Sequence, residues 1–342
     1  MKIAFAANNG DMGGGEVMLL ALAREAAALG HEVVVVGPAH PDQVVSEARS
    51  RGFNTQELPS NGRAGYMWSL RRWWVKERRE ILWCNGLLPA VATSGMKNRI
   101  VHLHQVPSAK LNRLLPLARK NSIRTLVPSN HMLKSISGAE VLPNWSEKVE
   151  KCDSLKDESS IRIGFIGRFS SDKGLPTLIE ALNKISLDAH KGIRLVLAGE
   201  PKFVGEADRR KVMDAIESST VEIDQIGWVK PSAFFSAVDF VVIPSVWQEP
   251  FGLVATETMS AQVPLIVSDA GALPEIVGND YPWIARAGDS EDLGRVITRA
   301  LKTSKEQRQQ TVYRAYGRWE SKFSPQAGRV ALDELLKSIE GK

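Results

Sequence analysis

The sequence of 342 residues has few cysteines and no long hydrophobic runs. Its longest apolar segments, such as the one that begins at Val33, are far shorter than the roughly 20 residues of a membrane helix, so no membrane span is expected. The opening MKIAFAANNG leads directly into glycines and predicts a first strand rather than a cleaved signal. The two cysteines, Cys84 and Cys152, lack metal-ligand spacing, which predicts reduced structural thiols in a cytoplasmic protein.

Acidic residues are absent between Glu80 and Glu140, while Lys and Arg occur throughout that stretch. Residues 1–145 contain 18 Lys and Arg against 10 Asp and Glu, although the net charge of the whole chain is only +5. The basicity therefore belongs to the front part, which suggests an anionic partner there.

Short β-rich runs alternate with helix-period segments along most of the chain, which is typical of parallel sheets built from β-α-β units. The strands are expected in KIAFAA, EVVVVG, ILWCNG, RIVHLHQ and RTLVPSN, then in IRIGFIGRF, IRLVLAGE, VEIDQIG, DFVVIPS and PLIVSD. We predict an α/β protein with two doubly wound, Rossmann-like domains, at residues 1–145 and 161–323, that face a central cleft and are joined by a polar linker at 146–160. A final helix at 324–342 follows, with packing against the first domain as one option.

The loop NNGDMGGGEVM carries three successive glycines, Gly13, Gly14 and Gly15, between the first strand and a helix that ends at Gly30. Glycines let backbone N–H groups approach a phosphate at a helix N-terminus, where the helix dipole favours negative charge. A merely flexible loop is the alternative interpretation, because the dinucleotide pattern G-x-G-x-x-G does not fit.

Two further loops follow strands of the second half. In IGRFSSDKG, Arg168 and Lys173 flank a strand-to-helix turn and could neutralise a diphosphate, whereas a solvated surface pair is the plain alternative. In PSVWQEPFGLVATE, Glu249 precedes a helix that begins near Gly252, and Glu257 lies about a turn and a half inside it. Carboxylates at this spacing could hold hydroxyls at the two ends of one elongated ligand.

Taken together, GGGE, HLHQ, PNW, GRFSSDKG, LAGE, GWVK and EPFGLVATE resemble the retaining glycosyltransferase family 4 of bacterial cell-envelope synthesis, which has the GT-B fold. The resemblance spans nearly the whole chain. It implies transfer of a hexosyl group from a UDP- or GDP-linked sugar to a hydroxyl of a glycan or lipid-linked acceptor, with retention of configuration.

The resemblance also implies roles for single residues. Glu249 would contact the donor sugar and Glu257 the ribose, as in the family's E-x7-E pair, and Arg168 and Lys173 would bind the diphosphate. His104 would hydrogen-bond near the donor sugar and phosphate; period 2 places His102 on the same face, so geometry alone does not separate the two. The remaining nucleotide-side and phosphate-side positions are Gly13, Gly14, Gly15, Trp228, Val229, Phe251, Gly252 and Leu253.

No D-x-D occurs, so no metal ion and no other cofactor is expected; cationic side chains and helix N-termini would stabilise the departing diphosphate. A sugar-nucleotide epimerase of the same fold is the nearest alternative. A nicotinamide-dependent oxidoreductase is disfavoured because no acidic residue ends the second strand in VVVVGPAH. A nucleic-acid partner is not expected, since no known binding module is present.

The segment GRAGYMWSLRRWWVKERREILW combines Arg and Lys with tryptophans. Helical spacing predicts that Met67, Leu70 and Trp74 pack inward, which leaves Trp73 and the basic residues outward. Those basic residues are Arg63, Arg71, Arg72, Lys76, Arg78 and Arg79. Such a face suits a peripheral anionic membrane surface, while an ordinary solvated basic face is the alternative.

Overall fold

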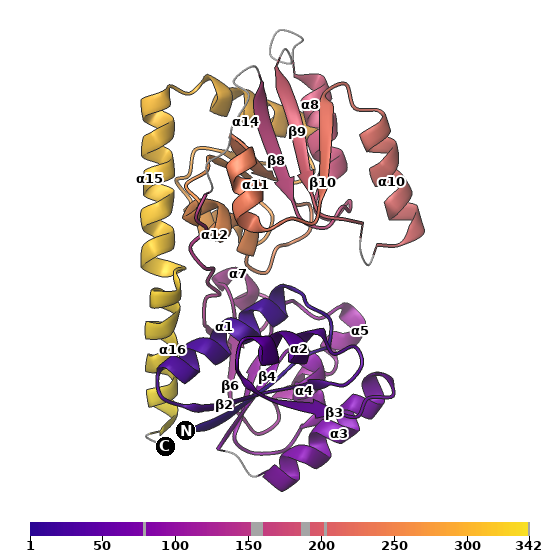
Figure 1. Cartoon of the computed structure of the whole chain (residues 1–342), viewed down its shortest axis with the longest axis vertical. Coiled ribbons are helices and arrows are strands. Elements are labelled where there is room, and N and C mark those ends of the chain that lie inside the picture. Colours follow the sequence, from indigo (N-terminus) through magenta and orange to yellow (C-terminus); the bar gives the residue numbers. More distant parts are fainter. Residues whose placement is uncertain (78–79, 152–159, 186–191, 202–203, 341–342) are drawn as a thin grey trace. The chain divides into compact units, whose positions relative to one another are not determined.

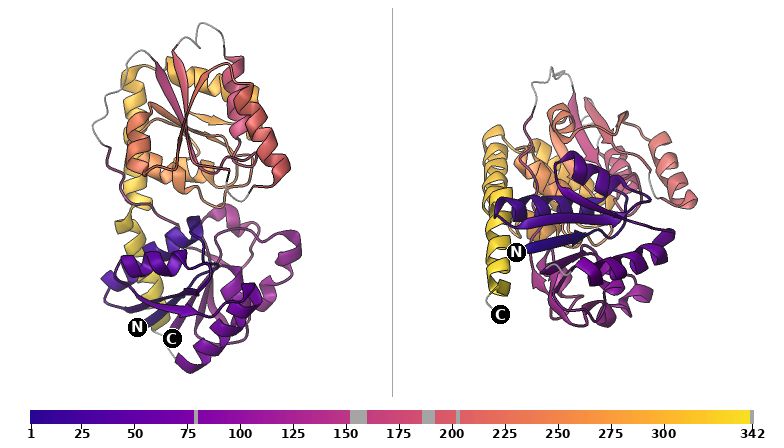
Figure 2. Two further views of the ribbon diagram at one scale, coloured as in Figure 1. Left: turned by 45° about the vertical axis from the view of Figure 1, so that its right-hand side comes forward. Right: turned by 60° about the horizontal axis from the view of Figure 1, so that its bottom comes forward.

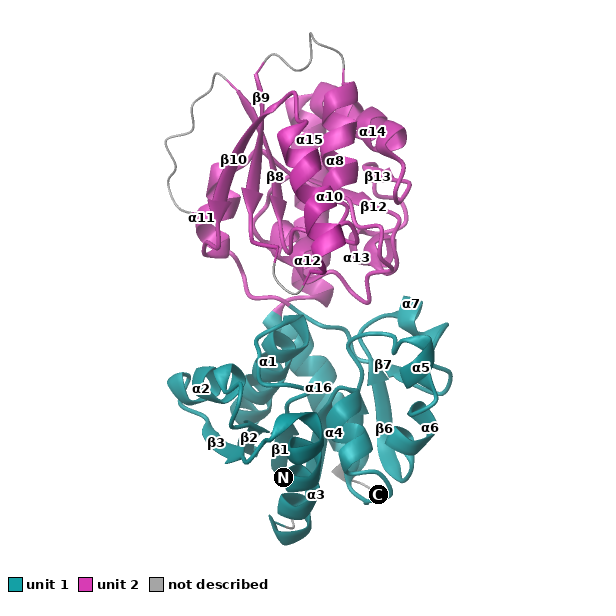
Figure 3. Ribbon diagram, turned by 90° about the vertical axis from the view of Figure 1, so that its right-hand side faces the viewer, with its two compact units in different colours: residues 1–145, 325–342 teal, residues 146–324 magenta. Residues whose placement is uncertain are grey.

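The structure, a computed structural model, describes residues 1–77, 80–151, 160–185, 192–201 and 204–340 (Figure 1). The chain forms two units, one of residues 1–145 with 325–342 and one of residues 146–324 (Figure 3). Cys152 and most of the segment expected as a linker lie outside the described residues. The described part of that segment belongs to unit 2, where Ser146 N donates to Phe323 O and Val149 N donates to Ser260 Oγ.

Unit 1 is built on a seven-stranded, wholly parallel sheet in the order β3-β2-β1-β4-β5-β6-β7. The strands are β1 (Lys2–Ala6), β2 (Glu32–Pro38), β3 (Asn54–Leu58), β4 (Ile81–Asn85), β5 (Arg99–His102), β6 (Ser122–Val127) and β7 (Glu140–Val141). The order reverses between β1 and β4. At such a switch point the loops leave in opposite directions and open a crevice at the carboxyl ends of the strands.

Helices cover both faces of this sheet (Figures 1 and 2). They are α1 (Gly14–Ala28), α2 (Gln43–Ser50), α3 (Gly62–Glu77), α4 (Leu87–Ala92), α5 (Ala109–Asn112), α6 (Leu115–Arg119), α7 (Asn130–Leu133) and α16 (Pro325–Glu340). The two-residue period of β1 decides which side chain meets which layer: Ile3 and Phe5 pack with α1, α2 and α16, while Ala4 and Ala6 pack with α3 and α4.

Unit 2 repeats the plan with six parallel strands in the order β10-β9-β8-β11-β12-β13. The strands are β8 (Ile161–Ile166), β9 (Ile193–Ala198), β10 (Glu222–Gly227), β11 (Phe240–Ile243), β12 (Leu265–Ser268) and β13 (Ile284–Ala285). The helices are α8 (Leu175–Lys184), α10 (Glu206–Glu217), α11 (Pro231–Ala237), α12 (Leu253–Ser260), α13 (Leu273–Val277), α14 (Ser290–Lys302) and α15 (Lys305–Lys322). Here the switch point lies between β8 and β11.

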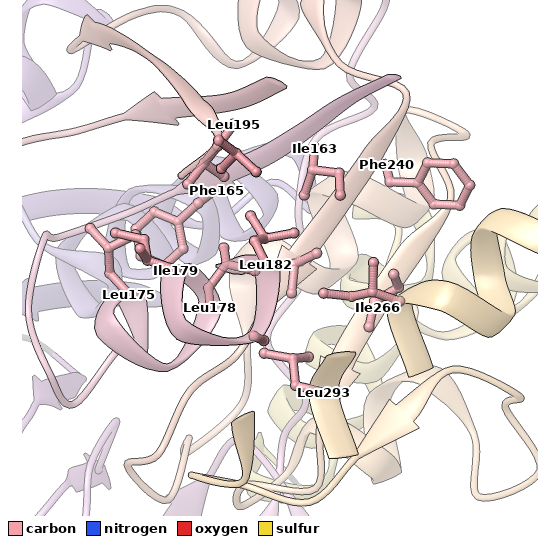
Figure 4. Packing of buried hydrophobic residues seen from close by; sticks show 14 of the residues in the cluster. Ile163, Phe165, Leu175, Leu178, Ile179, Leu182, Leu195, Phe240, Ile266 and Leu293 are labelled. Carbon is pink, nitrogen blue, oxygen red and sulfur yellow. The ribbon is translucent and has the colours of Figure 1, made fainter. Parts of the chain in front are cut away.

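Unit 2 has a hydrophobic core on each face of its sheet, one against α8, α10 and α14 and one against α11, α12, α13 and α15. Ile163 and Phe165 project from β8 onto Leu178 and Leu182 of α8 (Figure 4). These side chains are almost fully buried, and burial of one such aliphatic or aromatic group contributes roughly 1.5–3 kcal/mol. This packing holds the amino end of α8, and the loop before it, against β8.

The last helix, α16, is part of unit 1 (Figure 3). Leu332 and Leu336 join the core beside α1, and Arg329 Nε donates to Glu25 Oε2 at 2.7 Å. The Glu25 side chain is only 1% exposed, so its charge depends on this partner and on Arg24. Within the described ranges, none of the helices combines the length and the apolar character needed to cross a bilayer.

Candidate functional site

The switch point of unit 2 collects the charged residues that the sequence pointed to. Arg168 and Lys173 lie in the loop between β8 and α8, and Glu249 lies in the loop between β11 and α12. Because β8 and β11 are hydrogen-bonded neighbours, both loops leave the same part of the sheet edge. The expectation that these side chains belong to one group of residues therefore holds within unit 2.

Lys173 and Glu249 form an ion pair, although 76 residues separate them. Lys173 Nζ lies 2.6 Å from Glu249 Oε1, and Ser245 Oγ donates to the same oxygen at 2.6 Å. Ser268 Oγ donates to the Ser245 carbonyl at 2.6 Å and so joins β12 to this arrangement. The Glu249 side chain is 9% exposed, so the carboxylate is oriented by fixed partners rather than by water.

Arg168 has an acidic partner that the sequence analysis did not single out. Its Nη2 donates to Asp172 Oδ2 at 2.5 Å, and the Arg168 side chain is 38% exposed. Although burial opposes it, the Ser170 hydroxyl and the charges of Arg168 and Lys173 lower the pKa of Asp172. The spacing of four residues between Arg168 and Asp172 in GRFSSDKG was the available signal.

Two glycines shape the turn before α12: Gly252 within it, and Gly271 in the loop between β12 and α13, which packs against the Glu249 backbone. Gly252, the N-cap residue, has φ +111°, and a Cβ there would lie 2.7 Å from Leu273 Cδ2. Gly271 has φ +64°, and a Cβ there would lie 2.3 Å from Glu249 N. The predicted start of the helix near Gly252 is confirmed, and the helix begins at Leu253. The Phe251 side chain is buried in the core, so only its backbone could face a ligand.

Glu257 is the fifth residue of α12, as the spacing predicted. Burial raises the pKa of Glu257 to about 7. Trp228 and Val229 follow β10, which β9 and β8 separate from β11 in the sheet. Trp228 is 80% exposed, whereas Val229 packs partly against the core.

The glycine loop of unit 1 also lies at a switch point, after β1. Gly13 is the N-cap residue of α1 with an extended backbone, and Gly14 and Gly15 form its first turn. Gly13 and Gly14 are exposed, but Gly15 is half-buried beside His104. The helix therefore begins at Gly14, inside the stretch expected as a loop, and the exposed Gly14 amide at its N-terminus is open to an anion.

Glu16, the third residue of α1, is a buried acid that the sequence analysis did not single out. Burial raises its pKa to about 7, and Asp11 adds to the shift, while backbone N–H groups including those of Asn9 and Gly13 oppose it. A glutamate at the third helical position that reaches back to the N-cap amide is half of a capping box, which GGGE would have allowed us to predict.

His102 and His104 do lie on one face, with ring centroids 4.1 Å apart. The strand ends at His102, so His104 stands in the loop that follows β5 rather than in the strand. His104 Nε2 lies 2.7 Å from Asn85 Oδ1, and Asn85 Nδ2 donates to Gly15 O at 2.9 Å. Burial lowers the pKa of His104 to about 4 and that of His102 well below its usual range.

Most of the basic and aromatic segment forms α3, Gly62–Glu77, and Arg78 and Arg79 lie outside the described residues; the outward tryptophan is not the expected one. Trp73 is half-buried against the core and Trp68 is 63% exposed, because the core-facing stripe is set by Tyr66, Leu70 and Trp74. The Arg72 guanidinium lies 5.2 Å from the centroid of the Trp68 ring. The expectation for Trp73 was therefore wrong, and Met67 is only partly buried.

Two further observations bear on where ligands could bind. A surface hollow lies at the amino ends of β6 and β7 and is lined in part by Arg119, Lys120 and Ser137. The glycine loop lies at the other end of the strands, where β1 has its carboxyl end. Within the described ranges, no three His, Cys, Asp or Glu side chains are grouped in a way that could hold a metal ion.

Comparison with protein families finds two matching models. Residues 146–318 match the family described as "Glycosyl transferases group 1", and residues 12–144 match "Glycosyltransferase Family 4". The first match covers unit 2 and the second covers most of unit 1.

Relatives with curated descriptions include an uncharacterized glycosyltransferase of Methanocaldococcus jannaschii, 32% identical over 41% of this chain. The aligned part spans only 36% of that protein. The lipopolysaccharide 1,2-N-acetylglucosaminetransferase of Salmonella typhimurium is 26% identical over 68% of each chain. The capsular polysaccharide biosynthesis glycosyltransferase CapM of Staphylococcus aureus is 26% identical over 56% of this chain and 51% of its own.

Among solved structures, Anabaena HepE in complex with UDP-glucose matches with a TM-score of 0.85 and 18% identity, covering 99% of this chain and 100% of HepE. A sucrose-phosphate synthase from Thermosynechococcus elongatus matches with a TM-score of 0.83 and 17% identity, over 100% of this chain and 99% of its own. At such identities the likeness is one of fold.

Proposed function

Because the chain belongs to the glycosyl transferases group 1 and family 4, with the GT-B fold, we propose that it is a retaining, metal-independent glycosyltransferase that uses a nucleotide-diphosphate sugar. The acceptor is a hydroxyl of a glycan or lipid-linked molecule in cell-surface polysaccharide or glycolipid synthesis. Relatives that act in lipopolysaccharide and capsule synthesis support this acceptor class. The UDP-glucose bound to HepE supports a nucleotide-sugar donor.

The observation that carries the proposal is the ion pair of Lys173 and Glu249 at the switch point of unit 2. The ion pair places the Lys173 ammonium group beside a buried carboxylate that can accept hydrogen bonds from hydroxyl groups. When a donor binds, the ammonium group can turn toward the diphosphate, and Glu249 can accept a hydrogen bond from the sugar. Arg168, with its planar fork, would hold the same diphosphate.

In the transfer step the bond between the anomeric carbon and the phosphate oxygen breaks, and a bond to the acceptor oxygen forms on the same face. The acceptor proton moves to the departing phosphate oxygen. Arg168, Lys173 and the amides of the α12 N-terminus at Gly252 and Leu253 stabilise the charge that develops on the diphosphate. Glu257 binds the ribose hydroxyls, and Trp228 and Val229 are proposed to contact the base.

Unit 1 contributes the acceptor side in this proposal. The exposed Gly14 amide at the start of α1 is proposed to face an anionic group of the substrates, and His104 lies behind it against Gly15. A glycine-rich helix start can bind an anion through its N–H groups and the helix dipole, without a large local excess of charge.

Calorimetry with UDP, GDP, ADP and NADH tests the donor class. We expect one nucleoside diphosphate to bind and NADH not to bind; binding of NADH alone would favour an oxidoreductase.

A transfer assay tests the reaction itself. We expect turnover to persist in EDTA and NMR to show that the product keeps the anomeric configuration of the donor. Interconversion of the donor sugar without any acceptor would identify an epimerase instead.

The exposed side of α3 is proposed to bind an anionic bilayer surface from the cytoplasmic side. Trp68 offers an exposed aromatic ring, and Arg72 and Lys76 offer charge on the same helix. Co-sedimentation with vesicles of phosphatidylcholine alone and with 30% phosphatidylglycerol, a composition of about physiological anionic content, tests this. We expect binding only to the anionic vesicles and its weakening in Trp68→Ala; equal binding to both vesicle types would refute the surface.

A further inference from the structure

Asn85 joins His104 to the first turn of α1, and its hydrogen bonds determine where the protons are. Asn85 Nδ2 donates to the Gly15 carbonyl at 2.9 Å. A carbonyl oxygen can only accept, so the amide nitrogen must face Gly15 and Oδ1 must face His104. His104 Nε2, 2.7 Å from Oδ1, must therefore carry a hydrogen.

The other ring nitrogen of His104 is left as a bare acceptor. Burial keeps the imidazole neutral at pH 7, so with Nε2 protonated no hydrogen remains on Nδ1. His104 Nδ1 is buried and has no hydrogen-bond partner among the described residues. The His102 ring, also buried, lies with its centroid 4.1 Å from that of the His104 ring.

His104 also packs directly on the glycine loop. A Cβ on Gly15 would lie 3.4 Å from His104 Cδ2, so the ring rests against the Gly15 backbone. Asn85 is the last residue of β4 and pairs in register with His102 of β5. The start of α1 is therefore contacted by the Asn85 amide at the end of β4 and by the His104 imidazole just after β5.

We propose that Asn85 is a positioning residue: it holds His104 in the Nε2–H tautomer and, together with the ring, fixes the first turn of α1 so that the exposed Gly14 amide points at an anionic substrate. The role in catalysis rests on the proposed sugar transfer, whereas the tautomer and the order of the loop do not. In this arrangement the His104 imidazole acts on the glycine loop and does not contact a phosphate.

The tautomer can be observed without any substrate. In the uniformly ¹⁵N-labelled full-length chain at pH 7, long-range ¹H–¹⁵N correlation should show His104 neutral with hydrogen on Nε2. Asn85→Asp keeps the acceptor, so it should retain this tautomer and raise the His104 pKa, while Asn85→Ala should lose the tautomer preference. Asn112→Ala, an exposed asparagine on α5, is the matched control and should leave the spectrum unchanged. A wild-type His104 with hydrogen on Nδ1, or an unchanged tautomer in Asn85→Ala, would overturn the assignment.

Positioning of the loop has its own measurement. Hydrogen exchange of the Val17 amide, which closes the first turn by donating to the Gly13 carbonyl at 2.9 Å, should be about tenfold faster in Asn85→Ala, the size expected for loss of one or two hydrogen bonds. Unchanged exchange in a folded variant contradicts the proposal.

With UDP-glucose as the probe donor, kcat should fall by about tenfold in Asn85→Ala and in His104→Ala, and by no more in the double variant. If kcat of the double variant fell by the two single-variant factors multiplied together, Asn85 and His104 would act independently, which contradicts the proposal. Should UDP-glucose not be turned over, the exchange and tautomer results decide the matter alone, and only the sugar-transfer proposal is in question.

Discussion

The two switch points of this protein have the same topology and opposite chemistry. In unit 2 the loops carry ion pairs, Lys173 with Glu249 and Arg168 with Asp172. In unit 1 the corresponding loops carry glycines, an amide and imidazoles that burial keeps neutral. A neutral, glycine-rich edge can hold an anion through backbone dipoles, whereas the charged edge can stabilise charge that appears during a reaction. This difference supports our proposal that unit 2 carries the chemical step and that unit 1 orients the substrate.

Removing a cation from unit 2 should have the largest effect. Lys173→Ala or Arg168→Ala is expected to lower turnover on the order of 10²-fold, since each withdraws charge from the departing diphosphate. Steady-state kinetics with the donor identified by calorimetry measures this. Lys302→Ala, an exposed lysine at the end of α14, is the control. Near-normal kcat/KM in both site variants would contradict the proposal that the charged loops of unit 2 stabilise the departing diphosphate.

A steric change in unit 1 tests how firmly α16 is packed. In Gly328→Ala the new Cβ would lie 2.2 Å from Trp145 Cδ2, and overpacking of a buried site destabilises by about 1–3 kcal/mol. Urea unfolding gives the change in free energy. Gly317→Ala on α15 has no neighbour within 4 Å and should be neutral or stabilising by up to about 1 kcal/mol. Equal stability of the two variants would show that α16 is not packed as described.

Donor binding should depend on the ionisation of Glu257. Its pKa of about 7 means that the carboxylate, the form that accepts ribose hydroxyl bonds, is lost as the pH falls below 7. Affinity for the nucleotide should weaken by up to about tenfold between pH 8 and pH 6. Calorimetry across this range is the measurement. Glu257→Gln should bind more weakly at pH 8 and show little pH dependence; an unaltered Kd would remove the ribose role.

Glu16 is the matching buried acid of unit 1, and we expect it to affect stability. Its pKa is raised from 4.5 to about 7, so the folded state binds more protons than the unfolded state between these values. Stability from this group is therefore present below about pH 4.5 and lost as the pH rises to 7. As the pH rises from 4.5 to 7, the free energy of unfolding of Glu16→Gln should increase relative to that of the wild type by on the order of 1 kcal/mol. Thermal unfolding from pH 5 to 8 tests it, and a pH-independent difference would argue against the buried charge.

Much of the scaffold could be predicted because buried parallel strands are short apolar runs. The ten expected strands are all present, from KIAFAA to PLIVSD. Three strands were not predicted: β3, whose NTQEL is polar because it lies at the sheet edge, and β7 and β13, which have two residues each. Strands at a sheet edge bury few apolar side chains, so their sequences show little of the hydrophobic pattern on which the prediction depends.

Partners across the fold could not be predicted in the same way. Arg168 to Asp172 is a local spacing, but the contact of Lys173 with Glu249 and that of Asn85 with Gly15 join segments at least 70 residues apart. The prediction that Trp73 faces outward was wrong because helical spacing in the sequence defines the core-facing stripe only to within about one residue position. The pKa values of Glu16 and Glu257 depend on burial that no local pattern reports.

The sequence by itself determined the alternation of strands and helices, the loops at the strand ends and the residue types placed there, because these depend on local propensity and spacing. Only the tertiary structure decided which side chains meet, which carboxyl groups lose water and which ring nitrogen of His104 carries the hydrogen. Those properties arise from contacts between segments far apart in the chain, where desolvation and hydrogen-bond direction are set by neighbours that the sequence does not place side by side.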